Sequence, residues 1–197
     1  MARLLQFAAV ALYLVPTAAS AHTGVGDTSG FAHGLMHPLG GLDHQLAMIL
    51  VGIFAYQLGG RALWLVPLTF VFVMALGGFL GVVGITVPFV EAGIAFSVLA
   101  LGVIVAFKVR APVALAMGVV GLFAIFHGHA HGSEMPMDAS GLEYGIGFMA
   151  ATALLHGIGI GIGMVTGMSS KTLGDNVYRF AGGLASIAGF VLLLRCL

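Results

Sequence analysis

Long apolar stretches separated by short polar breaks dominate this 197-residue chain. Each stretch is near the roughly 20 residues that an α-helix needs to cross a bilayer. Six of them follow residue 41, at 42–58, 62–83, 87–107, 112–126, 142–165 and 177–194. Only 7% of the residues are charged, against roughly 25% in soluble domains. The pattern therefore predicts an all-α, polytopic membrane protein built as a bundle of six transmembrane helices.

The first 21 residues have the three parts of a secretory signal peptide. Arg3 supplies the positive end, residues 4–15 form the apolar part, and Ala19-Ser20-Ala21 matches an A-x-A cleavage site. The apolar part is too short to cross a membrane easily. We expect cleavage after Ala21, which leaves residues 22–197 as one transmembrane domain. An uncleaved anchor is the alternative.

Charged residues are distributed unequally between the two ends of the predicted spans. If the mature N-terminus lies outside, most basic residues fall at inner ends, namely Arg61, Lys108, Arg110, Lys171 and Arg179. Cytoplasmic loops of membrane proteins carry this excess of Lys and Arg. The acidic residues fall mostly outside, at Asp27, Asp43, Glu91, Glu134, Asp138 and Glu143. We therefore expect both the mature N-terminus and the C-terminus on the outer side of the membrane.

A first histidine segment opens the first span. His37 is followed by a proline and two glycines, and then by Asp43 and His44 at the start of the helix. We expect an irregular segment that lets His37 fold back toward His44. Neutral imidazole is the commonest metal ligand and suits Ni, Cu, Zn and Fe, and a carboxylate beside it adds an oxygen ligand. The alternatives are that Asp43 only caps the helix and that His44 only packs.

A second histidine segment follows the fourth predicted span. His127, His129 and His131 alternate with small residues, and Glu134 comes shortly after. In an extended conformation these histidines project to one side, and His127 can enter the bundle because it adjoins the span. We expect loose metal capture by this tract of His127, His129 and His131, with Glu134 beside it, and no single closed site. A solvated or pH-sensitive loop is the alternative.

His156 stands apart from the other histidines, within the fifth span. An ionisable side chain at membrane depth is costly and indicates function by default. We expect it further along an ion path, and the alternative is a hydrogen bond to a neighbouring helix. The same span carries two glycine pairs spaced by four, Gly157/Gly161 and Gly159/Gly163. Such pairs predict close helix contact.

The two histidine segments resemble the signatures of the HupE/UreJ family of bacterial membrane proteins, which are associated with hydrogenase and urease and regarded as nickel permeases. His37-Pro-Leu-Gly-Gly-Leu-Asp43-His44, followed by Met48, matches an HPxxGxDHxxxM pattern. Phe126-His127-Gly-His-Ala-His131-Gly-Ser-Glu134-Met-Pro136 is similar to the second signature. The resemblance implies handling of nickel, or alternatively cobalt, by His37, Asp43, His44, His127, His131 and Glu134.

Together with the resemblance, these observations predict a permease of the bacterial inner membrane, with its mature N-terminus in the periplasm. It would import Ni²⁺, or alternatively Co²⁺, from the periplasm through a mouth lined by His and Asp. We expect the ion as cargo and no permanently bound cofactor. The expected partners are the divalent ion, the lipid bilayer and nickel-enzyme maturation proteins. Nucleic acid is excluded because seven basic residues balance seven acidic ones. The sequence has no GxxxxGK[ST] motif for ATP, so facilitated diffusion is the simplest mechanism.

Two other functions fit parts of the pattern. An intramembrane metallohydrolase needs three ligands and a bound water, but the sequence has no HExxH motif. A metal-binding accessory or sensor protein needs the ligands and no transport path. We therefore expect that the chain is not an enzyme, and keep the accessory protein as the other alternative.

Overall fold

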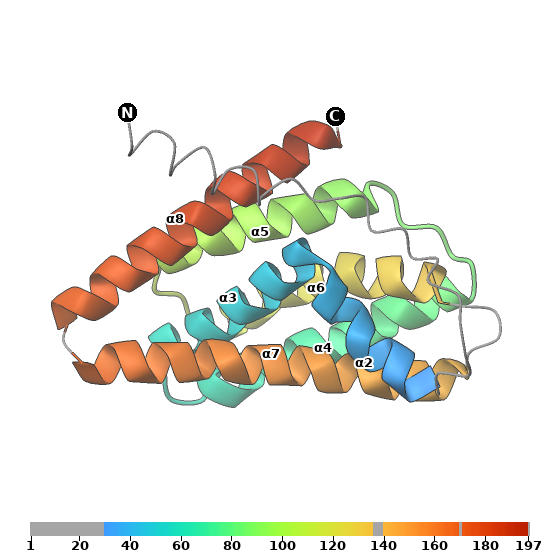
Figure 1. Ribbon diagram of the computed structural model, residues 1–197, viewed down its shortest axis with the longest axis horizontal. Helices are drawn as coiled ribbons and strands as arrows, with labels where there is room; N and C mark the ends of the chain where they lie inside the picture. The colour runs from blue at the N-terminus through green and yellow to red at the C-terminus, as the bar shows by residue number, and fades with distance from the viewer. Residues whose placement is uncertain (1–29, 136–139, 170, 197) are drawn as a thin grey trace, which may run out of the picture.

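The computed structural model describes residues 30–135, 140–169 and 171–196, and these form a bundle of helices (Figure 1). In chain order the helices are α2 (Gly30–Gly40), α3 (Leu42–Leu58), α4 (Ala62–Val82), α5 (Val90–Ala106), α6 (Val113–Ser133), α7 (Gly141–Ser169) and α8 (Lys171–Arg195). The all-α prediction is confirmed for this part of the chain. The predicted signal peptide lies outside the described residues.

The helices confirm a multi-pass membrane protein. Four of them, α4, α6, α7 and α8, are long and apolar enough to cross a membrane. Helices α2 and α3 meet at 85° and can together form one broken span, while α5 is a shorter apolar helix of 17 residues. The predicted count of six spans stays a prediction.

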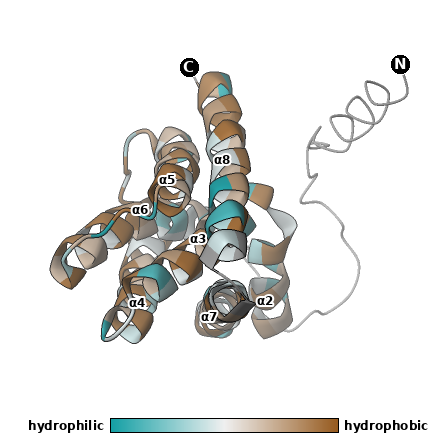
Figure 2. Cartoon of the chain, turned by 90° about the vertical axis from the view of Figure 1, so that its left-hand side faces the viewer, coloured by the Kyte–Doolittle hydropathy of each residue, from teal (hydrophilic) through white to brown (hydrophobic). Residues whose placement is uncertain are grey.

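The outer surface of the bundle is apolar, as a lipid-facing surface must be. Large hydrophobic side chains point outward from several helices, with Phe72 67%, Phe79 63% and Phe180 71% exposed. Hydrophobic colouring covers most of the outer helix surfaces (Figure 2). Exposed apolar area of this extent is rare on soluble monomers. The surface therefore fits a bilayer and explains the low charge content.

Helix α3 lies at the centre of the bundle and contacts α4, α5 and α7. The other close pairs are α4 with α6, α5 with α8, and α2 with α7 (Figure 1). Buried side chains of α3 and α4 such as Met48, Phe54, Phe70 and Met74 fill the interior. One end of the bundle gathers the starts of α3, α5 and α7 and the end of α6.

Two glycines bring α6 directly against the backbone of α4. A Cβ atom at Gly128 would lie 2.0 Å from the Met74 carbonyl oxygen, and one at Gly132 would lie 2.0 Å from the Gly78 carbonyl oxygen. Only residues without side chains allow so close an approach. This packing continues the helix to Ser133, well past the predicted end at residue 126. The histidine segment is therefore helical, and the one-sided arrangement that an extended conformation would give does not occur.

Close contact between α3 and α7 also depends on glycine. A Cβ at Gly159 would lie 2.1 Å from the Ile49 carbonyl oxygen, and one at Gly163 would clash with the Tyr56 ring. At Gly157 and Gly161 a Cβ would meet no described atom within 4 Å. One of the two predicted glycine strips therefore packs against a helix, and the other does not.

Candidate metal centre

A sharp corner between α2 and α3 places the first histidine segment. Helix α2 continues through Pro38 and ends at Gly40, so the expected irregular segment before the corner is helical instead. Gly41 alone breaks the helix, and the two axes differ by 85°. The Gln45 amide donates a hydrogen bond of 2.7 Å to the Leu39 carbonyl across the corner. This bond supplies a donor to a carbonyl at the helix end, which otherwise lacks one.

Asp43 holds the imidazole of His44 rather than capping the helix. Its Oδ1 accepts hydrogen bonds from the His44 backbone N–H at 2.8 Å and from His44 Nδ1 at 3.0 Å. The N-cap position belongs to Gly41, which makes no side-chain cap. Because a carboxylate only accepts, His44 carries its proton on Nδ1. Its Nε2 is buried and has no hydrogen-bond partner among the described residues.

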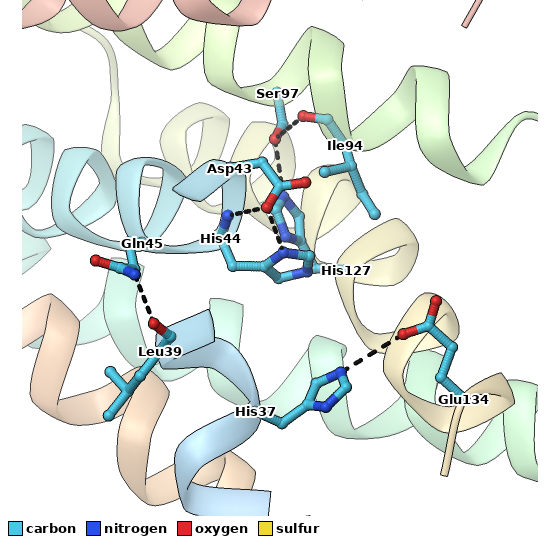
Figure 3. A network of polar contacts seen from close by, with 9 residues as sticks. All are labelled: His37, Leu39, Asp43, His44, Gln45, Ile94, Ser97, His127 and Glu134. Carbon is cyan, nitrogen blue, oxygen red and sulfur yellow. Dashed lines mark hydrogen bonds and ion pairs between the residues drawn. The ribbon is translucent and has the colours of Figure 1, made fainter. Parts of the chain in front are cut away.

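The end of α6 brings two further imidazoles to the same place. His127 and His131 are one helical turn apart and share a face, and they are 0% and 5% exposed. The ring centre of His44 lies 4.7 Å from that of His127 and 4.2 Å from that of His131. The two histidine segments therefore meet inside the bundle (Figure 3).

A second group lies closer to the surface. His37, His131 and Glu134 each offer a ligand atom, and these atoms lie within 4.8 Å of one another. His37 Nε2 is 3.5 Å from a Glu134 carboxylate oxygen (Figure 3). This contact lowers the pKa of Glu134, so its carboxylate is held in the charged form. His131 belongs to both groups, because its ring lies 4.6 Å from His37 as well as beside His44.

His129 does not join the histidines on either side of it in the sequence. On a helix it faces away from His127 and His131, and its Nε2–H donates a 2.8 Å hydrogen bond to the Ile85 carbonyl. It thereby ties the end of α6 to the loop between α4 and α5. Alternate histidines would share one side only in an extended segment.

His156 lies deeper, beyond an aromatic ring. It is 1% exposed, and neither of its ring nitrogens has a hydrogen-bond partner in the part of the chain that the structure describes. The Phe70 ring lies 5.2 Å from His156 and 5.7 Å from His127. Phe70 therefore contacts both His127 of the outer group and the deeper His156. The hydrogen bond to a neighbouring helix that offered an alternative role for His156 is absent among the described residues.

Sequence reasoning missed three side chains of the centre. Phe70 lies between imidazoles, Ser97 bonds His127 at 2.8 Å, and the Tyr144 ring lies 6.0 Å from that of His37. Only Ser97 gave a signal, as a lone hydroxyl in the apolar run of α5. Phe and Tyr are too common in membrane helices to stand out.

The donor set fits a divalent metal of borderline softness. Buried polar atoms in proteins are nearly all hydrogen-bonded. Here nitrogens of His44, His127 and His131 lie buried and unpartnered within the described ranges. Imidazole and carboxylate ligands without thiolate suit nickel, cobalt, zinc or copper(II).

Replacing Asp43 by asparagine should weaken metal handling while leaving the fold intact. The amide keeps a side chain of the same size, but it removes the charge that holds the His44 Nδ1 proton. Loss of such an orienting partner costs about 10–100-fold in metal affinity or activity. Calorimetric titration of the purified protein with Ni²⁺ should show a fall of about tenfold. Unchanged affinity would contradict this role.

Comparison with known proteins identifies the family of the chain. The family described as HupE / UreJ protein matches residues 10–192. Protein HupE of Rhizobium leguminosarum bv. viciae is 48% identical over 185 residues, which cover 94% of this chain and 95% of that relative. The chain belongs to the HupE/UreJ family. The resemblance read from the two histidine motifs is thus confirmed. No solved structure matches this HupE/UreJ protein.

Proposed function

We propose that this HupE/UreJ protein is a permease that passes Ni²⁺, or alternatively Co²⁺, inward across the bacterial inner membrane. One observation carries the proposal. Imidazoles from α3 and α6 meet inside an apolar bundle with ligand nitrogens that have no described partner. Such buried nitrogens are costly unless they bind something. A divalent cation in transit supplies that partner.

The exposed fractions of the ligand side chains set the order in which the ion meets them. Glu134 is 59% and His37 20% exposed by side chain, so they receive the ion first. His131 then passes it to His44 and His127, which are almost fully buried. After the carboxylate of Glu134, each step exchanges one imidazole ligand for another, which keeps binding weak enough for release. Asp43 supplies negative charge beside the path and offsets the cost of a cation there.

His156 is the next ligand inward. The ion reaches it past the Phe70 ring, which contacts both His127 and His156. An aromatic face stabilises a cation that has lost part of its water. The unprotonated ring nitrogen of His156, which has no hydrogen-bond partner among the described residues, can then bind the ion in turn.

The opposite end of the bundle supplies an exit. A cavity of about 490 Å³ lies there between the ends of α3 and α7 and the start of α8. Lys108 forms an ion pair with Asp175 at its edge, and Arg110 also lines it. The positive-inside tendency assigns this end to the cytoplasm. Import therefore runs from the histidines toward Lys108, by facilitated diffusion, and delivers the ion to nickel-enzyme maturation proteins.

Uptake of radioactive Ni²⁺ into vesicles containing the purified protein tests the proposal. The protein should admit Ni²⁺ down its gradient, without ATP. His44→Ala should lower the rate by more than about tenfold, because it removes a ligand held by Asp43. Gly118→Ala is the matched control, since a Cβ there meets no described atom within 4 Å. Its uptake should equal that of the unmodified protein.

Other outcomes would identify the competing functions. Tight Ni²⁺ binding with no uptake would contradict the permease and indicate an accessory or sensor protein. Metal-dependent hydrolysis of a membrane substrate without uptake would indicate a metallohydrolase. Uptake of Co²⁺ faster than of Ni²⁺ would assign cobalt as the cargo.

A further inference from the structure

Ser97 is the only hydroxyl residue in α5, and it lies fully buried beside the metal centre. Its Oγ is 2.7 Å from the Ile94 carbonyl oxygen of its own helix and 2.8 Å from His127 Nε2 on α6 (Figure 3). The first contact is the ordinary bond of a helical serine to the preceding turn. The second joins two helices at the candidate site.

These two contacts together decide where the proton of His127 lies. A serine hydroxyl has one proton, and a backbone carbonyl can only accept. The hydroxyl proton therefore goes to Ile94, and Ser97 Oγ accepts from His127. His127 must then carry its proton on Nε2. In the neutral ring, Nδ1 is left with a bare lone pair.

That lone pair lies on the side where a cation would pass. His127 Nδ1 is buried, without a hydrogen-bond partner in the described residues, and lies on the side of the ring that faces Asp43 and His44 (Figure 3). Asp43 fixes His44 in the opposite tautomer, with Nδ1 protonated and Nε2 bare. Asp43 and Ser97 thus hold the two protons away from ligand nitrogens of adjacent rings. Partners of this kind set the tautomer and orientation of metal-binding histidines.

We infer that Ser97 is a positioning residue, which locks His127 in the Nε2–H tautomer and so keeps Nδ1 available to the transported divalent cation. The part that concerns transport rests on the proposed function. The tautomer itself does not, because the hydrogen bonds form without metal. Ser97 touches neither the ion nor the path and acts only through His127.

Nitrogen NMR of the metal-free protein tests the tautomer directly. The full-length protein is labelled with ¹⁵N-histidine, and His127 is assigned by the signals that His127→Gln lacks. The unmodified protein should show a protonated Nε2 and a bare Nδ1. In Ser97→Ala neither nitrogen has a fixed partner, so a mixture of tautomers should appear. A protonated Nδ1 in the unmodified protein, or a pure Nε2–H form in Ser97→Ala, would overturn the inference.

Ser186→Ala on α8 is the matched control. Ser186 also donates to the carbonyl of its own preceding turn, Gly182, at 2.8 Å, and no histidine contacts it in the described structure. A loss of helix stability alone would appear in both alanine variants. A change in the His127 signals should appear only in Ser97→Ala. Equal changes in both variants would reduce Ser97 to an ordinary structural serine and overturn its positioning role.

Ni²⁺ uptake by the same variants tests the consequence. Ser97→Ala should slow uptake about tenfold, Ser97→Thr should restore most of the rate because it keeps the hydroxyl, and Ser186→Ala should leave it unchanged. Unaltered uptake in Ser97→Ala, despite mixed tautomers, would overturn the link to transport. If the unmodified protein takes up no Ni²⁺, the proposed permease fails, and the NMR result still decides the role of Ser97.

Discussion

His131→Ala is expected to lower Ni²⁺ uptake by at least about 100-fold, more than removal of any other single ligand. His131 is the one imidazole that belongs to both groups of the centre, with ring distances of 4.6 Å to His37 and 4.2 Å to His44. Removing an orienting partner of a ligand already costs about 10–100-fold. Loss of a ligand that joins the outer group to the buried one must cost more.

The neighbouring His129 supplies the control for this prediction. It lies on the same helix two residues away, but its ring donates to the Ile85 carbonyl on the other face. His129→Ala should therefore retain most of the uptake rate. Both variants are measured in vesicles with matched protein content, after gel filtration shows unaltered particles. Equal losses in the two variants would mean that histidine content matters here and the geometry of the centre does not.

The sequence predicted helix ends correctly where turn-forming residues flank the helix. The first span was expected at 42–58, which are the observed ends of α3. Gly41 precedes it and Gly59 and Gly60 follow with positive φ angles of 70° and 52°. Glycine adopts this backbone conformation without strain. A glycine at a helix end acts through its own backbone conformation. The amino-acid sequence alone is therefore sufficient to locate such a helix end.

The end of the fourth span was placed at residue 126, seven residues too early, because the histidine segment that follows has the composition of a loop. Glycine, serine and alternating histidines normally indicate a solvated turn. Yet Gly128 and Gly132, like His127 and His131, are spaced by four, which is the helical period. That spacing was present in the sequence, but its meaning depends on α4, whose backbone fills the space above each glycine.

The ligand partners that sequence could not supply come from distant helices. Asp43 was found beside His44 because the two are adjacent in the chain. Ser97 bonds a histidine thirty residues away, and Phe70 contacts imidazoles of two different helices. These pairings depend on how α4, α5 and α6 pack, which no local pattern specifies. Residue chemistry therefore predicted which side chains come together, and packing determines how they are held.

A substitution at the glycine contact between α6 and α4 is expected to have the second large effect, first on thermal stability. A Cβ at Gly128 would lie 2.0 Å from the Met74 carbonyl oxygen, so Gly128→Ala must push the two backbones apart. Overpacking of this kind costs about 1–3 kcal/mol, and the midpoint of thermal unfolding in detergent should fall by roughly 5–10 °C. Gly118→Ala on the same helix meets no described atom within 4 Å. Its midpoint should stay or rise, because alanine favours the helix.

The same substitution should also impair transport below its unfolding temperature. Gly128 lies between His127 and His131 in the sequence, so displacing this turn of α6 moves both imidazoles away from His44. Ligand atoms must stay within about 0.5 Å of a productive geometry, whereas a Cβ that lies 2.0 Å from the Met74 carbonyl oxygen must force the two backbones apart by more than that. Ni²⁺ uptake by Gly128→Ala at a temperature where it remains folded should therefore fall at least tenfold. Full uptake by a folded Gly128→Ala would show that the centre tolerates movement of α6 and that its geometry does not limit transport.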